Sequence, residues 1–582
     1  MAYRAHLFSL RLGHAVREAC IAEPYGKQRF LRDLMAGVTV GIIATPLAMA
    51  LAIASGAPPQ HGLYTAIIAG FLIALTGGSR YSISGPTAAF VVILHPVAVK
   101  YGLGGLLVAT VLSGVILVIM ANLRMGRFIE YIPESVTLGF TGGIAVVIAT
   151  LQLNDLLGLG LGEMPEHFME KLFFITENLE RLHWPSVGIA LLTFAILLLW
   201  PLFKTPIPPH LPAVVIASLA AWELNQLGHA VDTIGSRFHY LLADGTTGSG
   251  IPALLPHFSW PWQQAGADGQ PLAFSWNLAR DMITAAFAMA MLGAIESLLC
   301  AVILDGMSGK RHSANSELLG QGIGNIVAPF FGGFTATAAI ARSAVNVKAG
   351  AESPVAAMVH ALLVLLALLV LAGALSFLPM PALAALLMVV AWNMSEAHKS
   401  VSFLGKGSRS EILVFATCFS LTVLFDMVIA ITTGVLLAAI LFMKEIAEMT
   451  KLTEITDDRH LIPAALPAGW RGFKVTGPLF FAAADRIFGE LAQKAGECRG
   501  IVLYLDGVSL LDSGGLSAMT RLMDQCRKSG TELWFTEWQV QPLRTLSHAN
   551  IAPEDELCHF SATLPEALAI LHSRRGQNEK NP

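Results

Sequence analysis

Long apolar runs separated by short polar loops fill the first three quarters of the chain. A helix that crosses a bilayer needs about 20 apolar residues, and fourteen segments either approach that length or form a shorter run beside a break. The predicted segments are 34–55, 62–77, 83–97, 103–122, 133–152, 185–202, 210–228, 281–303, 318–331, 335–347, 354–374, 379–395, 411–424 and 427–443. Two of them, 83–97 and 335–347, are too short to cross a membrane alone.

The basic residues of the loops test this count, because short loops rich in Lys and Arg lie on the cytoplasmic side. With an even number of spans, the basic residues of the short loops and of both flanks fall on one side, Lys100 excepted. The rule is weak in two long loops, 153–184 and 229–280. We therefore expect a transmembrane domain over 31–448, with a cytoplasmic N-terminal segment over 1–30 and a cytoplasmic C-terminus.

Composition agrees with a lipid environment and excludes several classes of function. Of the 582 residues, 54% are hydrophobic and only 13% are charged, whereas soluble domains are about a quarter charged. A net charge of -4 gives no reason to expect a nucleic-acid partner. The chain carries no P-loop, HExxH or GxSxG pattern, so we expect neither an enzyme nor a cofactor.

The two short segments resemble each other. SRYSISGPTAAFVVIL (79–94) and GGFTATAAIARSAVNV (332–347) both begin with small and hydroxyl residues beside a Gly or Gly-Pro break. They lie seven spans apart, and because seven is odd, a second set of seven spans runs inverted relative to the first. Paired interrupted helices of this kind indicate a transporter's binding site. Their N-termini carry unpaired N–H groups that attract anions.

Arg342 gives the second short segment a positive charge that can pair with a carboxylate or sulfate. The alternative is a structural role, either an ion pair with a buried acid or a side chain that extends to the cytoplasm. Four hydroxyl residues near the breaks either bind the anion or satisfy the broken backbone: Ser84, Thr87, Thr335 and Thr337.

Glu296 is the other charge inside the apolar segments, in the middle of the eighth span. A carboxylate in a low dielectric can exchange a proton near neutral pH, so we predict that Glu296 couples transport to protons. A permanent ion pair, with Arg342 for example, is the alternative. Asp426, at the turn between the last two spans, is expected to cap a helix rather than to bind substrate.

The last part of the chain has the composition of a soluble domain. A polar connector over 449–469 precedes alternating strands and helices, which predict a small α/β domain over 470–575. The last residues, 576–582, are expected to be disordered.

Several long motifs make the chain similar to the SulP family of anion transporters, the bacterial relatives of the SLC26 proteins. The resemblance covers roughly residues 30 to 575 and rests on PLAMALAIASGAPPQHGLY, SISGPTAAF, IESLLCAVILDGMSGKRHSANSELLGQGIGNIVAPFFGG and ATAAIARSAVNVKAGA. The tail resembles a STAS domain, with LDSGGL as its characteristic loop. This resemblance implies fourteen spans in a seven-plus-seven inverted repeat, a mobile core domain and a gate domain, and often a homodimer.

The resemblance also implies a substrate site between the third and tenth helices. Matched by position, the site residues are Ser84, Gly85, Pro86, Thr87, Ala88, Ala341, Arg342 and Ser343, and Glu296 matches the acidic position of the eighth helix. In some STAS relatives a serine of this loop is phosphorylated, and Ser513 is its candidate counterpart here. The alternative role for this loop is to cap the following helix, and the domain leaves room for a soluble cytoplasmic partner.

Two departures from the family pattern bear on the cargo. Many members carry Gln after the proline of the first span, where this chain has Leu47, and many carry Ser before the arginine, where it has Ala341. A larger, less polar site favours a small carbon-bearing anion. Motifs such as AWNMSEAHK also resemble those of the DauA-like branch of bacterial C4-dicarboxylate transporters. Together, these features predict proton-coupled transport of succinate, fumarate or aspartate.

Three alternatives remain open. The first is transport of sulfate or bicarbonate, with sodium as a possible coupling ion. The second is a channel-like conductor that does not accumulate its substrate. The third is a membrane sensor that signals through the STAS domain.

Overall fold

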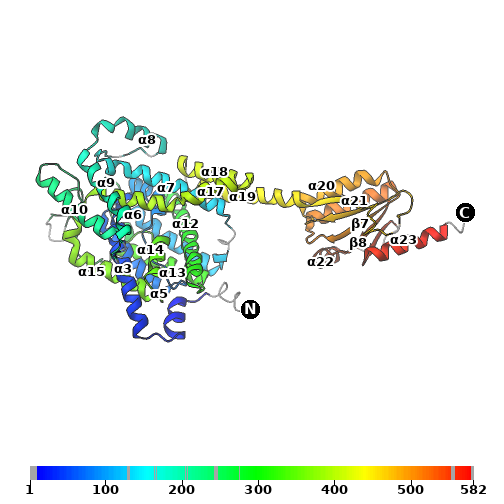
Figure 1. Cartoon of the computed structure of the whole chain (residues 1–582), viewed down its shortest axis with the longest axis horizontal. Helices are drawn as coiled ribbons and strands as arrows, with labels where there is room; N and C mark the ends of the chain where they lie inside the picture. The colour runs from blue at the N-terminus through cyan, green and yellow to red at the C-terminus, as the bar shows by residue number, and fades with distance from the viewer. Residues whose placement is uncertain are drawn as a thin grey trace. The chain divides into compact units, whose positions relative to one another are not determined.

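The computed structural model describes residues 10–127, 132–162, 164–165, 167–203, 205, 207–241, 247–273, 275–425, 427–463, 465–551 and 557–578. Contacts divide the chain into two compact units, 1–435 and 436–582. The first is the helical part at the left of Figure 1, and the second contains the sheet. Each unit is described by itself below.

The first unit consists mainly of helices, and each predicted span corresponds to a helix or to part of one. Its main helices are α3 (Lys27–Ala54), α4 (Pro59–Tyr64), η2 (Thr65–Ala69), α5 (Gly70–Thr76), α6 (Ala88–Asn122), α7 (Glu134–Leu157), α9 (Trp184–Leu199), α10 (His210–Gln226), α12 (Trp276–Ser308), α13 (Ala314–Val327), α14 (Ile340–Lys348), α15 (Val355–Leu375), α16 (Met380–Met394), α18 (Arg409–Leu424) and α19 (Met427–Met449), which runs on into the second unit. Among the described residues, eight helices are long and apolar enough to cross a membrane. The predicted count of fourteen is consistent with these helices together with the shorter and broken ones.

Two predicted spans are joined in one element. The helix α6 contains residues 88–97 of the first predicted segment and all of the segment predicted at 103–122, and it is interrupted between them at Gly102, where φ is 66°. The helical starts predicted at 83 and 335 are wrong. Both stretches are extended, as the short strands β1 (Ser84–Gly85) and β4 (Thr337–Ala338), because their polar backbone pairs across the unit instead of within a helix.

The helices pack in two groups. The core helices are α3 to α6 and α12 to α15, with α6 packed against α12 and α13, and α3 against α15. The gate helices are α7, α9, α10, α16, α18 and α19, in which α7 packs against α16 and α18. Fewer contacts join the groups, chiefly between α3 and α16 and between α6 and α7.

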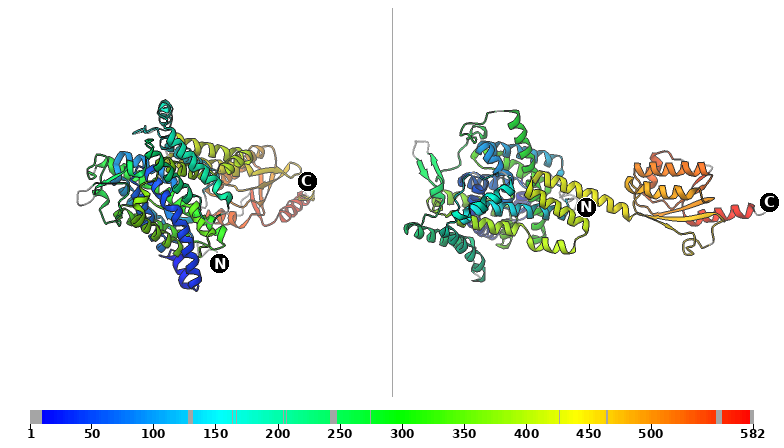
Figure 2. Two further views of the ribbon diagram at one scale, coloured as in Figure 1. Left: turned by 60° about the vertical axis from the view of Figure 1, so that its left-hand side comes forward. Right: turned by 90° about the horizontal axis from the view of Figure 1, so that it is seen from above.

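The connections hold short elements that the hydrophobic pattern did not predict. They are α2 (His14–Val16), η1 (Arg17–Ala22), α8 (Phe168–Glu177), η4 (Leu179–Arg181), α11 (Ile234–Arg237), η6 (Pro261–Gln263) and α17 (Ala397–Lys406). Two further short elements, η5 (Trp200–Phe203) and η7 (Ala328–Phe331), lie at the ends of the spans predicted at 185–202 and 318–331. In the long connection between α10 and α12, β2 (His239–Leu241) and β3 (Thr247–Ser249) form an antiparallel hairpin, seen at the edge of the unit in Figure 2. Asp426 lies outside the described residues.

The second unit is a five-stranded sheet with helices on both faces. Its elements are β5 (Lys451–Glu454), β6 (Trp470–Thr476), α20 (Phe481–Ala495), β7 (Gly500–Gly507), α21 (Ser513–Ser529), β8 (Glu532–Thr536), α22 (Val540–His548), β9 (Cys558–Ser561) and α23 (Leu564–Asn578). The strand order is β5-β6-β7-β8-β9, and only the β5–β6 pair is antiparallel.

The alternation of side chains along β7 explains the two faces of this sheet, since successive residues point to opposite sides. Ile501 and Leu503 pack in the cluster with α20 and α21, whereas Val502 packs with α23. Two boundaries differ from the prediction. Residues 451–454 of the expected linker form the edge strand β5, and the expected disordered tail from 576 begins inside α23, which extends to Asn578.

Candidate functional site

The two short strands place two helix N-termini beside each other. Strand β1 pairs with β4 in antiparallel register, Ser84 opposite Ala338 and Gly85 opposite Thr337. Each strand leads within three residues into a helix, α6 or α14. Because the strands are antiparallel, the two segments of the chain enter their helices in opposite directions, as the predicted inverted repeat requires. Backbone that is not helical is tolerated at membrane depth only where protein or a cavity surrounds it.

Neither helix N-terminus is capped by a side chain. The N-cap residues Thr87 and Ala339 are extended, with φ of −125° and −92°, and neither side chain accepts a bond from its helix. The first N–H groups of a helix have no intrahelical partner, and they carry the positive end of the helix dipole. These amides are therefore available to an anion.

The Arg342 side chain extends from α14 to the end of β1, beside Gly85 and Pro86. It is 2% exposed, and its Nη2 donates a hydrogen bond to the Pro86 carbonyl oxygen at 2.6 Å. Its Nε and Nη1 have no hydrogen-bond partner in the described chain. A Cβ added to Gly85 would lie 3.2 Å from Nη1, so glycine leaves room for the guanidinium. A buried charge with two unsatisfied donors is costly unless a ligand completes it.

Glu296 reaches the same place from α12. The Thr87 hydroxyl donates to Glu296 Oε2 at 3.0 Å, and the partner found for Arg342 is Pro86. Within the described chain the two opposite charges are thus held by different neighbours, without the direct ion pair that the sequence left open. Arg342 is buried and Glu296 is partly buried, and opposite charges attract each other more strongly away from bulk water.

The other predicted site residues divide into two sets. Ala341 is exposed at the start of α14, and Ala88 is buried at the start of α6. The Ser84 hydroxyl accepts a bond from the Gln321 amide at 3.1 Å, and the Ser343 hydroxyl accepts one from the Ile83 N–H at 2.9 Å. These two serines therefore fasten the strands to their surroundings.

The two threonines of the second break have structural partners. Thr337 donates to the Gly293 carbonyl oxygen at 3.1 Å, and the hydroxyls of Thr335 and Thr110 are 2.8 Å apart. Both side chains are fully buried. Of the two roles that the sequence left open for these hydroxyls, the contacts match satisfaction of the surrounding polar groups.

Sequence reasoning missed three polar residues of α13 that contact this region: Glu317, Gln321 and Asn325. All three lie inside the long family motif at 295–333. Their signal is the four-residue spacing, because residues i, i+4 and i+8 share one face of a helix, and a polar face on an apolar helix needs an explanation.

Ser513 lies in the second unit and has a different environment. It is exposed at the start of α21, and the helix is capped by Asp512, whose Oδ1 accepts from the Gly515 N–H at 2.7 Å. The capping alternative is thus confirmed, with Asp512 as the capping residue.

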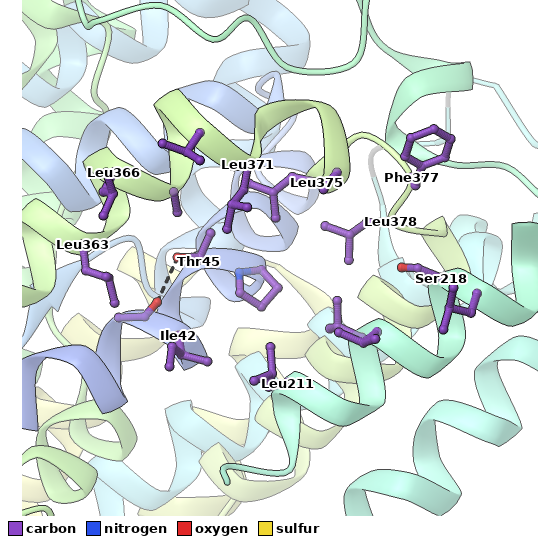
Figure 3. Close-up of a pocket in the computed structure, with 18 of the residues that line it drawn as sticks. Ile42, Thr45, Leu211, Ser218, Leu363, Leu366, Leu371, Leu375, Phe377 and Leu378 are labelled. Carbon is purple, nitrogen blue, oxygen red and sulfur yellow. Dashed lines mark hydrogen bonds between the residues drawn. The ribbon is translucent and has the colours of Figure 1, made fainter. Parts of the chain in front are cut away.

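A large cavity of about 930 Å³ opens elsewhere in the first unit, between α3, α10 and α15. Figure 3 shows its apolar wall, which includes Ile42, Leu211, Leu363, Leu371, Phe377 and Leu378. Its few polar groups include the Thr45 hydroxyl, which donates to the Gly41 carbonyl oxygen at 2.8 Å. No charged side chain of the described chain lines this cavity, so it offers an anion no counter-charge and suits lipid chains instead.

Facing half-helices around a buried arginine, in a unit of membrane-spanning helices, are typical of one class of protein, the multi-pass membrane transporters. The sequence matches the model of the "Sulfate permease family" over residues 30–418 and that of the "STAS domain" over 469–567. The chain therefore belongs to the sulfate permease (SulP/SLC26) family. It is an anion transporter and not an enzyme.

Individual relatives agree with this assignment. The chain is 36% identical to the "Putative sulfate transporter YvdB" of Bacillus subtilis (strain 168), over 92% of this chain and 97% of the other. It is 28% identical to the "Bicarbonate transporter BicA" of Picosynechococcus sp. (strain ATCC 27264 / PCC 7002 / PR-6), over 82% and 83%.

Solved structures show the same fold. The murine Slc26a9 anion transporter in the inward-facing state matches with a TM-score of 0.81 at 19% identity, over 96% of this chain and 94% of the other. The transmembrane domain of a cyanobacterial bicarbonate transporter BicA matches with a TM-score of 0.59 at 28% identity, over 70% and 98%. The names of these relatives refer to sulfate, bicarbonate or anions and not to dicarboxylates.

Proposed function

We propose that this protein moves a small oxyanion across a bacterial inner membrane by alternating access, with the anion bound between the N-termini of α6 and α14. The observation that carries this proposal is the pair of buried donors on Arg342, Nε and Nη1, which have no partner in the described chain. A planar guanidinium with two free donors matches an oxyanion, and two uncapped helix N-termini add to the same field.

The moving parts in this proposal are the two groups of helices. The residues around the anion lie on the core helices, and the gate helices face them through fewer contacts. A core group that moves against a fixed gate group would expose the site first to one side of the membrane and then to the other. Binding residues that stay on one rigid body would keep the anion contacts intact during that movement.

Glu296 supplies the proposed coupling to protons. With Glu296 ionised, its charge balances that of Arg342, and the Thr87 hydroxyl donates to the carboxylate. With Glu296 protonated, the region has a net positive charge and Thr87 becomes free to donate to an anion. Anion and proton therefore favour each other's binding, and this reciprocity is what symport requires.

Two kinds of cargo are supported by different observations. Leu47 and Ala341 remove polar groups that many family members carry, and Ala341 is exposed at the start of α14, which favours a carbon-bearing anion. Our first candidate is therefore a C4-dicarboxylate such as succinate, fumarate or aspartate. The second is sulfate or bicarbonate, the anions for which the relatives are named.

Further parts of the proposal concern assembly and orientation. We place both termini in the cytoplasm, because the basic residues of the short loops favour that side. A homodimer and a soluble partner for the STAS domain are proposed from the family resemblance.

The test is uptake of labelled succinate into proteoliposomes that contain the purified full-length protein, with and without an inward proton gradient. Unlabelled fumarate, sulfate and bicarbonate serve as competitors, and Arg342→Ala, which should take up less anion at low concentration, is the comparison variant. Gradient-driven accumulation that fumarate blocks supports the dicarboxylate proposal. Competition or uptake with sulfate or bicarbonate alone overturns the dicarboxylate but keeps the oxyanion site. Uptake of none of these anions contradicts the proposed function.

A further inference from the structure

Helix α13 carries a polar stripe along one face. Glu317, Gln321 and Asn325 follow each other at intervals of four residues, so they lie one above the other on the helix surface. All three are at most 1% exposed. Burying three strongly polar side chains is costly unless each is hydrogen-bonded, so their partners are informative.

Asn325 holds the strand that leads to Arg342. Its Nδ2 donates to the Ala336 carbonyl oxygen at 2.9 Å, and its Oδ1 accepts from the Ala336 N–H at 2.7 Å. The Asn325 side chain thus makes the two backbone hydrogen bonds to Ala336, just before β4, that a neighbouring strand would otherwise make. Because both backbone groups of Ala336 are fixed, the direction of β4 and the start of α14 are fixed with them.

Glu317 and Gln321 hold the other strand. Glu317 Oε2 accepts from the backbone N–H groups of Gly78 and Ser79 at 3.0 and 2.9 Å, in the segment that leads into β1. Gln321 Nε2 donates to Glu317 Oε1 and to the Ser84 hydroxyl, both at 3.1 Å. An ionised carboxylate accepts hydrogen bonds but cannot donate them. It therefore requires that the NH2 group of the Gln321 amide, and not its oxygen, faces Glu317 and Ser84.

The helix that carries this stripe is itself held tightly. A Cβ at Gly322 would lie 2.9 Å from the Gly114 carbonyl oxygen of α6, and one at Gly320 would lie 2.5 Å from the Gly77 Cα. Such close approach leaves α13 little freedom to shift. By contrast, β1 and β4 pair over only two residues each, and a pair that short is not stable on its own.

We propose that Glu317, Gln321 and Asn325 are positioning residues that set the anion affinity of the site without touching the anion. They hold the backbones of both strands against the rigid helix α13, and thereby aim the two helix N-termini and Arg342 at one point. This inference rests on the proposed anion site. It adds that the affinity of the site depends on a third helix, whose contacts to the strands are made by side chains.

Asn325→Ala tests the inference, with Asn315→Ala as the matched control. Both asparagines lie on α13 and are 0% exposed, and both bind a backbone group, but Asn315 Oδ1 accepts from the N–H of Gly126, in the connection after α6. The full-length variants are compared in proteoliposomes for KM and maximal rate of uptake, with succinate, sulfate and bicarbonate as probes, and for melting temperature. We expect Asn325→Ala to raise KM at least tenfold and Asn315→Ala to change it less than twofold.

Equal changes of KM in the two variants, or no change in Asn325→Ala, would overturn the inference, because a purely structural role predicts similar losses of stability and no selective loss of affinity. If the wild-type protein takes up none of the three probes, the proposed function fails and the inference fails with it. Wild-type uptake with an unchanged KM in Asn325→Ala contradicts the inference alone.

A second experiment covers the case in which Asn325→Ala does not fold. Gln321→Met, which is nearly isosteric, is combined with Ser84→Ala in a double-mutant cycle of KM. If Gln321 acts through Ser84, the double variant should have a KM no higher than the worse single variant. If the increases in KM of the two single variants instead multiply in the double variant, the two side chains act independently. That result would contradict the positioning role of Gln321.

Discussion

The two units of this protein place their polar side chains in opposite ways. In the first unit the buried side chains include charged ones, such as Asp33, Glu317 and Arg342. In the described part of the second unit, the buried polar side chains are threonines: Thr450, Thr531 and Thr536. Its interior is otherwise an apolar cluster of sheet and helix residues such as Phe473, Leu503 and Phe535.

The difference follows from the surroundings of each unit. In water, burial of apolar surface is the main force that assembles a domain, so the interior of the second unit is apolar. In lipid, the surroundings are as apolar as the side chains, and helices associate through close packing and hydrogen bonds. A membrane unit can therefore collect polar groups inside, and the anion site that we propose consists of such groups. The predictions below test this contrast.

The largest effect is expected in the apolar interior of the second unit. Phe535→Ala removes a fully buried ring from β8 and should lower the free energy of unfolding of that unit by about 3–5 kcal/mol. Phe481→Ala, at a side chain that is 58% exposed, is the control and should have little effect. Denaturation of the full-length protein, followed by hydrogen exchange of each unit, checks this. Equal loss of protection in both units would contradict the contrast.

Arg342→Ala tests the polar interior of the first unit. The variant loses a charge that we place against the anion, and a charged hydrogen bond is worth about 1.5–3 kcal/mol, so KM should rise roughly ten- to a hundredfold. Arg342→Lys keeps the charge but lacks the planar guanidinium, so its KM should lie between those of the wild type and Arg342→Ala. Uptake kinetics measure both. A normal KM in Arg342→Ala would assign the arginine a structural role.

Glu296→Gln should change the pH dependence of uptake more than its maximum. Glutamine keeps an oxygen that can accept from Thr87 but has no proton to exchange. We expect the variant to lose acceleration by an inward proton gradient while still binding the anion. Uptake rates between pH 5.5 and 8.5, with and without the gradient, are the measurement. Gradient-driven accumulation equal to that of wild type would remove Glu296 from the coupling role.

The smallest effect concerns the ion pairs of the N-terminal segment. Glu23 Oε1 lies 3.0 Å from Lys310 Nζ and 2.9 Å from Arg80 Nη1. The hydrogen bond from Lys310, followed in size of effect by the one from Arg80, lowers the pKa of Glu23 from 4.5 to about 2. Because the folded-state pKa is the lower one, the carboxylate stabilises the fold above pH 4.5, and this contribution is lost as the pH falls toward about 2.

Glu23→Gln should therefore lower the melting temperature slightly at pH 7, by an amount that corresponds to about 1 kcal/mol or less for a partly exposed pair. The difference from wild type should shrink as the pH falls below 4. Glu490→Gln, in an exposed ion pair with Lys494 in the second unit, is the control. A difference that grows in acid would have the wrong sign and would contradict the assignment.

Much of the fold follows from sequence patterns that a short window contains. The apolar runs placed helices at each predicted span, and the continuous apolar run IVLYL is typical of a buried strand, as β7 is. Three elements of the second unit were missed, β5, α22 and β9. They are short, and their residues face a sheet that exists only after the strands have assembled, so the local pattern carries little signal for them.

The site shows the same limit. The small residues and the breaks near Gly85 and Arg342 indicated an anion site at two broken helices. They did not indicate that both breaks are extended and pair with each other, since that pairing joins residues 254 positions apart, Ser84 and Ala338. Nor did they show that Ser84 is held from behind by Gln321.

By itself the sequence determined which segments are apolar enough for lipid, where helices are interrupted and which charges lie inside the apolar part. These are properties of neighbouring residues, and hydropathy and backbone chemistry act locally. Only the tertiary structure decided that Arg342 keeps two free donors, that Glu296 bonds to Thr87, and that α13 holds both strands. The physical reason is that a buried polar group is defined by the partners that folding gives it, and those partners come from distant parts of the chain.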